Sequence, residues 1–195
     1  MRIHVTDLDQ LGWYHKLETM TADQLVARLM RTEPPNEKMF LGSTFHSLLE
    51  SCPDKIDSVS ENGYNFTITC DAEIKAPQIK EVRAHKEYDV DGRKVFLSGK
   101  CDGITGNKVI DHKLSFRPNP EYYFESYQWR AYLDIFSADI FQYILYSAKQ
   151  KDNDIEIYDI SVMDMYRYPG MKDDVITGIR NFLDFVDHNC PEYGR

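Results

Sequence analysis

Long apolar runs are missing from this sequence of 195 residues. None approaches the roughly 18 consecutive apolar residues that a membrane-spanning helix needs. The first residues, MRIHVTDLDQ, contain no apolar core of a secretory signal. The sequence also has no internal repeat and no low-complexity linker. These absences predict a single cytoplasmic domain over residues 1–195, with no membrane partner.

Cysteine is scarce and scattered. The four cysteines, Cys52, Cys70, Cys101 and Cys190, form no C-x-x-C pair, which excludes the usual local metal and redox motifs. Their even number would allow disulfides. Because the chain shows no secretory signal, we expect reduced thiols instead, with Cys101 packed in the core.

The sequence also lacks an excess of basic residues. Lys and Arg number 23 against 32 Asp and Glu, which gives a formal net charge of −9. Proteins that bind nucleic acids usually carry a basic footprint, so this charge counts against tight unassisted binding. A local basic groove would still be compatible with it. The hydrophobic share, 42%, is ordinary for a globular protein.

Helix signals come first along the chain, and strand signals follow. The T-x-x-Q pattern at 21–24 is a capping box that opens a helix, and a second helix is expected over about 43–52. From Tyr64 the apolar period changes to two, which predicts strands. Asp-Gly at 91–92 and Gly-Asn at 106–107 predict two tight hairpin turns.

Later segments continue this alternation. Asn119-Pro120 predicts the start of a helix that runs to about Phe136. IFQYILYSAK and IEIYDISVMDMY read as strands, and a last helix is expected over about 173–188. The order of elements predicts an α/β (α+β) domain with a central mixed β-sheet flanked by helices. Residues 1–60 would form the N-terminal helices, and residues 61–195 the sheet core.

The stretch KVIDHKLS at 108–115 places an acid and a base on one face of a strand. Side chains at i and i+2 point the same way, so Asp111 and Lys113 lie side by side. If Gly106-Asn107 is a two-residue loop, Asp102 comes directly opposite Asp111 in the hairpin. Two carboxylates placed so closely repel each other.

Three arrangements would relieve that repulsion. One carboxyl could take up a proton, solvent could screen both, or a divalent cation could lie between them. A bulge would shift the register by one residue. Gly99 and Gly103, which flank Asp102, would tolerate a bulge or the close approach of a substrate backbone.

With a cation bound between the acids, Lys113 gains a role. An ammonium beside a divalent ion stabilises the attacking water and the charge that grows on a phosphodiester. An isolated D-x-K pattern is more often a surface ion pair. Two acids and a lysine on one face indicate metal-assisted hydrolysis of phosphodiesters.

Four segments together resemble a known family. SGKCDGI followed by VIDHKLS resembles the G-x-x-D and (D/E)-x-K motifs of the PD-(D/E)XK nuclease superfamily, more narrowly its RecB-like and lambda-exonuclease-like branch. GSTFHSLLE resembles the upstream helix of that branch, and YQWRAYLD its Q-x-x-x-Y motif. The four occur in family order over residues 42–132, roughly half of the chain.

The resemblance implies a restriction-endonuclease-like core and a role for each matched residue. Asp102, Asp111 and His46 would be ligands of Mg²⁺ or Mn²⁺, and the backbone carbonyl of His112 would be a further ligand. Lys113 would assist the attacking water. Alternatively, His46 has a purely structural role and forms a hydrogen bond with Glu50, four residues later on the same helix.

Residues after the catalytic strand have two open interpretations. Gln128 and Tyr132 lie one helical turn apart and would hold a DNA strand or brace Lys113; packing of a helix on the sheet explains them equally. Arg117 and Arg130 lie near the motifs and would contact phosphates. They also fit an ordinary charged surface.

The resemblance also implies cofactors and partners. Iron–sulfur members of the branch carry a C-terminal group of cysteines that this chain lacks, so we expect no iron–sulfur cluster. The expected activity is a Mg²⁺- or Mn²⁺-dependent DNA exonuclease that acts on linear ends in the cytoplasm of a bacterial or phage-infected cell. Expected partners are DNA, a recombination protein such as a single-strand annealing protein, and further copies of this chain.

Two alternatives remain open for the function. The chain could be a nuclease-fold module that binds DNA ends or a partner with little turnover, as its net charge suggests. It could also be a structure-specific endonuclease.

Overall fold

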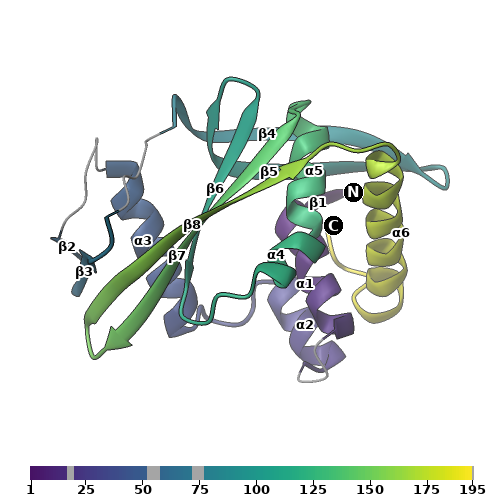
Figure 1. Cartoon of the computed structure of the whole chain (residues 1–195). Helices are drawn as coiled ribbons and strands as arrows, with labels where there is room; N and C mark the ends of the chain where they lie inside the picture. The colour runs from purple at the N-terminus through teal and green to yellow at the C-terminus, as the bar shows by residue number, and fades with distance from the viewer. Residues whose placement is uncertain (17–19, 52–57, 72–76, 195) are drawn as a thin grey trace.

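A computed structural model describes residues 1–16, 20–51, 58–71 and 77–194. In this part of the chain, one mixed sheet of eight strands lies between helices on its two faces (Figure 1). The helices are α1 (Val5–Lys16), α2 (Ala22–Leu29), α3 (Glu37–Ser51), α4 (Pro120–Glu125), α5 (Tyr127–Phe136) and α6 (Met171–Asn189). The strands are β1 (Arg2–His4), β2 (Ser58–Glu61), β3 (Tyr64–Ile68), β4 (Ile79–Val90), β5 (Arg93–Thr105), β6 (Lys108–Ser115), β7 (Ile140–Lys151) and β8 (Asp154–Tyr166).

The strand order is β1-β5-β6-β7-β8-β3-β2, and β4 pairs with β5. β4 occupies one edge of β5 along most of its length. β1 and β6 share the other edge, where β1 pairs in parallel near the middle of β5 and β6 pairs antiparallel at its end. Among the described residues, no strand pairs on that edge with the backbone of β5 between these two partners.

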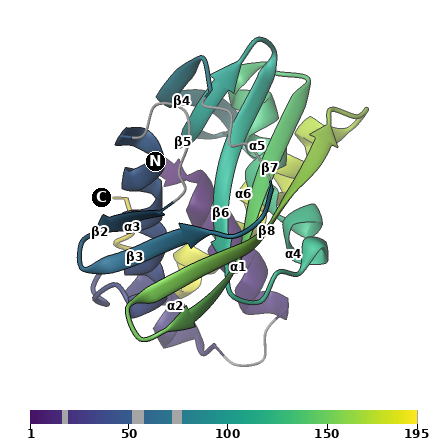
Figure 2. The ribbon, with the colours of Figure 1, turned by 60° about the vertical axis from the view of Figure 1, so that its left-hand side comes forward.

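Two apolar clusters hold the layers together. The larger cluster joins one face of the sheet to α1, α2, α5 and α6, and includes Phe141, Tyr143 and Phe182. The smaller joins α3 to the β7–β8 hairpin and β3, and includes Phe45 and Tyr146. Figure 2 shows β3 beside this hairpin, in agreement with its pairing to β8. Among the described residues, no helix combines the length and apolar character needed to cross a bilayer.

The mixed sheet with flanking helices confirms the predicted fold class. The capping box at Thr21 is present, and both predicted hairpin turns form. The predicted helix over 43–52 was placed too late: α3 begins at Glu37, because Asn36 Oδ1 accepts the N–H of Met39. Cys52, at the predicted end of that helix, lies outside the described residues.

Two other boundaries differ from prediction. The helix expected from Asn119 to Phe136 is broken at Ser126, where the backbone leaves the helical region with ψ 141. The N-terminal part, predicted as helices, also contributes β1 to the sheet. A strand of three residues is too short for its period to be recognised in the sequence.

Candidate active site

The two predicted acids lie where β5 and β6 separate. The ladder between these strands has the predicted register but ends at the pair Gly103–Ile110. Asp102 and Asp111, the next residues, therefore do not form the ladder pair that was predicted. Instead, the Asp102 carboxylate enters the gap, and its Oδ2 accepts a hydrogen bond from the backbone N–H of His112 at 2.7 Å.

Asp111 is buried, with 3% of its surface exposed. Its Oδ1 accepts a hydrogen bond from Gln128 Nε2 at 3.0 Å, and its Oδ2 lies 2.7 Å from Lys113 Nζ. Apart from that ion pair, Oδ2 has no hydrogen-bond partner in the part of the chain that the structure describes. Burial raises the pKa of Asp111 to about 6; the Lys113 charge opposes this effect and the Asp102 charge adds to it. Its carboxylate therefore carries an incompletely compensated charge at neutral pH.

His46, on α3, faces the other carboxylate. Its Nδ1 lies 3.3 Å from Asp102 Oδ1. Burial acts to lower the pKa of His46, but the hydrogen bond and charge of Asp102 outweigh it and raise that pKa. For Asp102, burial acts to raise the pKa, and the contacts with His46 and Lys113 outweigh it and lower that pKa. The structure thus brings His46 and Asp102 together as a hydrogen-bonded pair.

The Lys113 ammonium interacts with the charges of both carboxylates, Asp111 and Asp102. Burial acts to lower its pKa, but the charges of Asp111 and Asp102 outweigh burial and raise it. The side chain keeps 28% of its surface exposed. The Lys113 ammonium therefore stays charged beside a buried acid.

The ring and the backbone of His112 face different surroundings. The ring turns toward the smaller cluster, where Nδ1 lies 2.9 Å from Tyr146 Oη, and burial lowers the pKa of His112 to about 4. Because the N–H and C=O of one strand residue face the same neighbour, its carbonyl points toward β5, as its N–H does. The carbonyl lies beyond the end of the ladder, and its role as a ligand stays a prediction.

Gln128 and Tyr132 are both buried on one face of α5, at 6% and 2% exposure. Gln128 holds Asp111, and Tyr132 Oη donates to the carbonyl of Lys100 at 2.7 Å. These contacts correspond to the bracing alternative, with Asp111 rather than Lys113 as the braced group. Neither side chain is directed to solvent, where a DNA strand would lie.

The two glycines beside Asp102 make room for protein rather than for substrate. A Cβ at Gly99 would lie 2.1 Å from the Tyr132 ring, and one at Gly103 would lie 2.3 Å from the Pro77 ring. Both positions therefore allow close packing against β5. On β4, Glu81 has a positive φ of 59°, and the β4–β5 register is the same on both sides of it.

The predicted arginines are not gathered at the carboxylates. Arg117 is exposed, and the contact described for it is its backbone N–H to Ser115 Oγ at 3.3 Å. Arg130 donates from Nη1 to the Ser126 carbonyl at 2.7 Å and from Nε to Tyr168 Oη at 2.9 Å. Two residues after Gln128, it projects from the opposite side of α5, away from Asp111.

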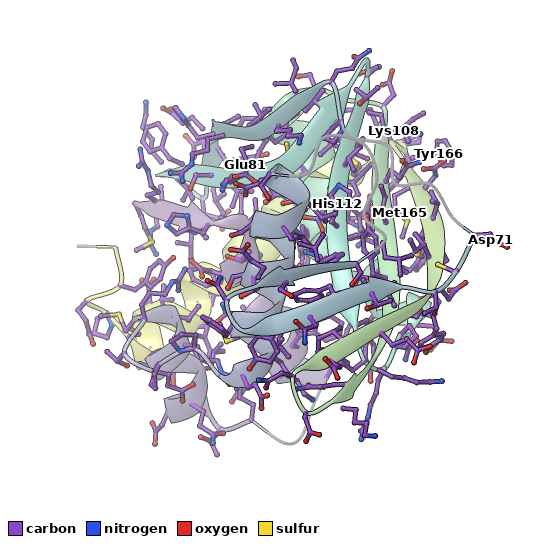
Figure 3. All side chains as sticks on the ribbon, turned by 90° about the vertical axis from the view of Figure 1, so that its left-hand side faces the viewer. Asp71, Glu81, Lys108, His112, Met165 and Tyr166 are labelled. Carbon is purple, nitrogen blue, oxygen red and sulfur yellow. The ribbon has the colours of Figure 1, made fainter. Side chains whose placement is uncertain are left out.

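Sequence reasoning missed several polar residues around Asp102. A small cavity beside it is lined by Lys80 and Glu81 of β4 together with His46, Glu50 and His112; Figure 3 labels Glu81 and His112 next to α3. Glu81 also forms an ion pair with Lys100. The turn at 91–92 already contained the signal, since continuing its register places Glu81 opposite Asp102.

The donor set fits a hard divalent cation. Carboxylate oxygens, a carbonyl and one imidazole are ligands suited to Mg²⁺ or Mn²⁺, and Oδ2 of Asp111, held only by its ion pair with Lys113 among the described residues, could serve as such a ligand. Within the residues described, no three His, Cys, Asp or Glu side chains already converge on one point. His46 and Lys113 are each drawn to a carboxylate, so coordination would require these side chains to shift.

Comparisons with known proteins find structures of the same fold. No protein-family model and no curated protein matches the chain. A candidate exonuclease of Eubacterium rectale is 12% identical with a TM-score of 0.56, and the match covers 96% of this chain and 82% of that chain. LHK-Exo, an alkaline exonuclease of Laribacter hongkongensis solved in complex with dAMP, is 10% identical with a TM-score of 0.50, covering 95% and 87%.

At such identities the likeness shows the fold alone. The mixed sheet and its flanking helices are shared with these two solved structures, which confirms the predicted fold.

Proposed function

We propose that this chain, which folds like these exonucleases, is a Mg²⁺- or Mn²⁺-dependent deoxyribonuclease that hydrolyses phosphodiester bonds from DNA ends. One observation carries the proposal: Asp102 and Asp111 lie at the point where β5 and β6 separate, with Lys113 Nζ 2.7 Å from Asp111 Oδ2. Two acids and an ammonium are the groups that metal-assisted phosphodiester hydrolysis requires.

The ion would be held by Asp102, Asp111, His46 and the carbonyl of His112. When bound, a divalent ion neutralises phosphate charge and makes water a stronger nucleophile. Lys113 supplies a fixed positive charge next to the phosphoryl oxygens, where negative charge grows in the transition state. The residues of the chain thus combine ion binding with a cation that needs no proton transfer to act.

A basic groove supports a nucleic-acid substrate despite the net charge of −9. It leads away from Lys100, two residues before Asp102, and none of its described lining residues is acidic. Its five basic side chains are Arg2, His4, Arg83, His85 and Lys100. Arg83 is directly opposite Lys100 in the β4–β5 ladder, and Lys100 also forms an ion pair with Glu81. The positive side chains along this groove would attract the phosphate groups of a DNA strand.

The exonuclease names of the two fold neighbours favour cleavage from ends over internal cleavage. Under this proposal the protein acts in DNA recombination or repair, in the cytoplasm of a bacterial or phage-infected cell. A single-strand annealing protein and further copies of the chain are its proposed partners.

The test is cleavage of end-labelled linear duplex and single-stranded DNA with and without Mg²⁺. We expect release of nucleotides with Mg²⁺ and none in excess chelator. Asp111→Asn and Lys113→Ala should each lower cleavage by at least about a hundredfold, because each removes a group that acts on the reacting phosphate. Asp23→Asn, a change of an exposed carboxylate on α2, is the matched control. Full activity of either site variant, or activity in chelator, would defeat the proposal.

The net negative charge favours a second candidate, a module that binds DNA ends with little turnover. Metal-dependent binding to linear duplex without release of nucleotides would support this second function. Cleavage of closed circular DNA as fast as linear DNA would instead indicate an endonuclease.

A further inference from the structure

Asp9 of α1 reaches across to the N-terminus of α5. Its Oδ2 accepts a hydrogen bond from Ser126 Oγ at 2.7 Å, and its Oδ1 accepts from the backbone N–H of Tyr127 at 2.6 Å and of Gln128 at 3.2 Å. The first N–H groups of a helix have no partner within the helix, and the helix dipole favours an anion there. Asp9 therefore fixes where α5 begins and which way its first turn faces.

Gln128 connects this clamp to the carboxylates. Its backbone N–H is shared between Asp9 and Ser126 Oγ, the latter at 2.9 Å. Its side-chain amide, buried at 6% exposure, donates to Asp111 Oδ1 at 3.0 Å. With one oxygen held by Gln128, the Asp111 carboxylate cannot rotate freely, and Oδ2 stays directed toward Lys113.

We propose that Asp9 is a positioning residue for the divalent-ion site, acting through the start of α5 and Gln128 on the orientation of Asp111. This inference rests on the proposed function, because it assigns Asp9 a part in that same site. It concerns a residue far in sequence from the motifs that predicted the site, on the N-terminal helix α1.

Capping of α5 alone does not account for Asp9. Ser126 already caps this helix through the N–H of Gln128. Asp9 repeats that bond and adds one to Tyr127, and its added effect is to tie α5 to α1 at a set position. Burial raises the pKa of Asp9, and the hydrogen bond from Ser126 only partly opposes this effect. A buried carboxylate therefore costs more free energy than a neutral side chain that only caps the helix would.

The test measures Mn²⁺ binding to the DNA-free protein by calorimetry, and the Mg²⁺ concentration that gives half-maximal cleavage. Asp9→Ala should weaken Mn²⁺ binding about 10–100-fold, the loss typical of a residue that orients a metal ligand. Asp9→Asn should keep most of the affinity. Its amide oxygen still accepts from Tyr127 and Gln128, and its NH₂ group can donate to Ser126 Oγ. A loss in Asp9→Asn as large as in Asp9→Ala would overturn a positioning role.

A double-mutant cycle separates this path from general stabilisation. If Asp9 acts through Gln128, Asp9→Ala combined with Gln128→Ala binds Mn²⁺ no more weakly than Gln128→Ala alone. If the loss from Asp9→Ala persists in full on the Gln128→Ala background, the inference is wrong. Thr21→Ala is the matched control. It removes the N-cap of α2, in which Thr21 Oγ1 accepts a hydrogen bond from the backbone N–H of Gln24, and it should leave the Mn²⁺ affinity unchanged.

Thermal melts identify variants that fail to fold. Should Asp9→Ala be unfolded, Asp9→Ser replaces it, since one short hydroxyl cannot accept all three bonds, and the same cycle applies. Unchanged Mn²⁺ affinity in a folded Asp9→Ala or Asp9→Ser protein overturns the inference. Wild-type protein that binds Mn²⁺ but cleaves no DNA would defeat the proposed nuclease function and leave the Asp9 cycle measurable.

Discussion

Replacing the buried acid Asp111 by asparagine should stabilise the protein when no divalent ion is present. Burial raises the pKa of Asp111 from 3.8 to about 6, so the folded chain holds this proton more tightly than the unfolded chain does. The stability of the wild type therefore falls as pH rises from 3.8 through about 6. Asparagine resembles the protonated acid in shape and avoids this loss.

The size of the effect follows from the shift. At about 1.4 kcal/mol per pKa unit, the shift makes Asp111→Asn about 3 kcal/mol more stable than wild type at pH 8. At pH 5 the carboxyl is mostly protonated in the folded chain, and the difference should shrink to about half of that.

Urea denaturation in chelator at pH 5 and pH 8 measures both values. Asp23→Asn, in an exposed position of α2, should show no such pH-dependent difference. Addition of Mg²⁺ should then stabilise the wild type and not Asp111→Asn, because the ion needs the carboxylate. Equal stability of wild type and Asp111→Asn at pH 8 in chelator, or a difference independent of pH, would refute the claim that burial destabilises this charge.

Three further predictions concern the packing at Gly99, the basic groove and the thiol of Cys101. Gly99→Ala should cost about 1–3 kcal/mol of unfolding free energy by urea denaturation, because its Cβ would lie 2.1 Å from the Tyr132 ring; unchanged stability would contradict that contact. Arg83→Ala should weaken binding of single-stranded DNA and reduce the slope of log affinity against log salt by about 1, while Lys151→Ala at the far end of β7 should not; equal slopes would exclude the groove. Burial raises the pKa of Cys101 to about 12, so iodoacetamide should label this thiol only after unfolding, and labelling of the folded protein by mass spectrometry would contradict its burial.

Much of the local structure was predictable from the sequence because it depends on neighbouring residues. The period-two strands, the two hairpin turns and the capping box at Thr21 each rest on contacts within a few residues. The register set by the turn at 106–107 predicted that Asp102 and Asp111 lie opposite each other. The observed β5–β6 ladder follows this register as far as the pair Gly103–Ile110. Asn36 before α3 was a readable cap that the prediction passed over.

Tertiary structure decided what the carboxylates contact. Beyond the pair Gly103–Ile110, toward Asp102, the strands separate because the Asp102 carboxylate accepts the N–H of His112, a competition that no local pattern records. The break at Ser126 likewise depends on Asp9, which lies 118 residues from Tyr127 in sequence. Local propensities determined that there would be strands, turns and an acid pair, because those follow from backbone geometry within a few residues. Long-range hydrogen bonds and burial decided which oxygen of Asp111 binds Gln128 and which one faces Lys113.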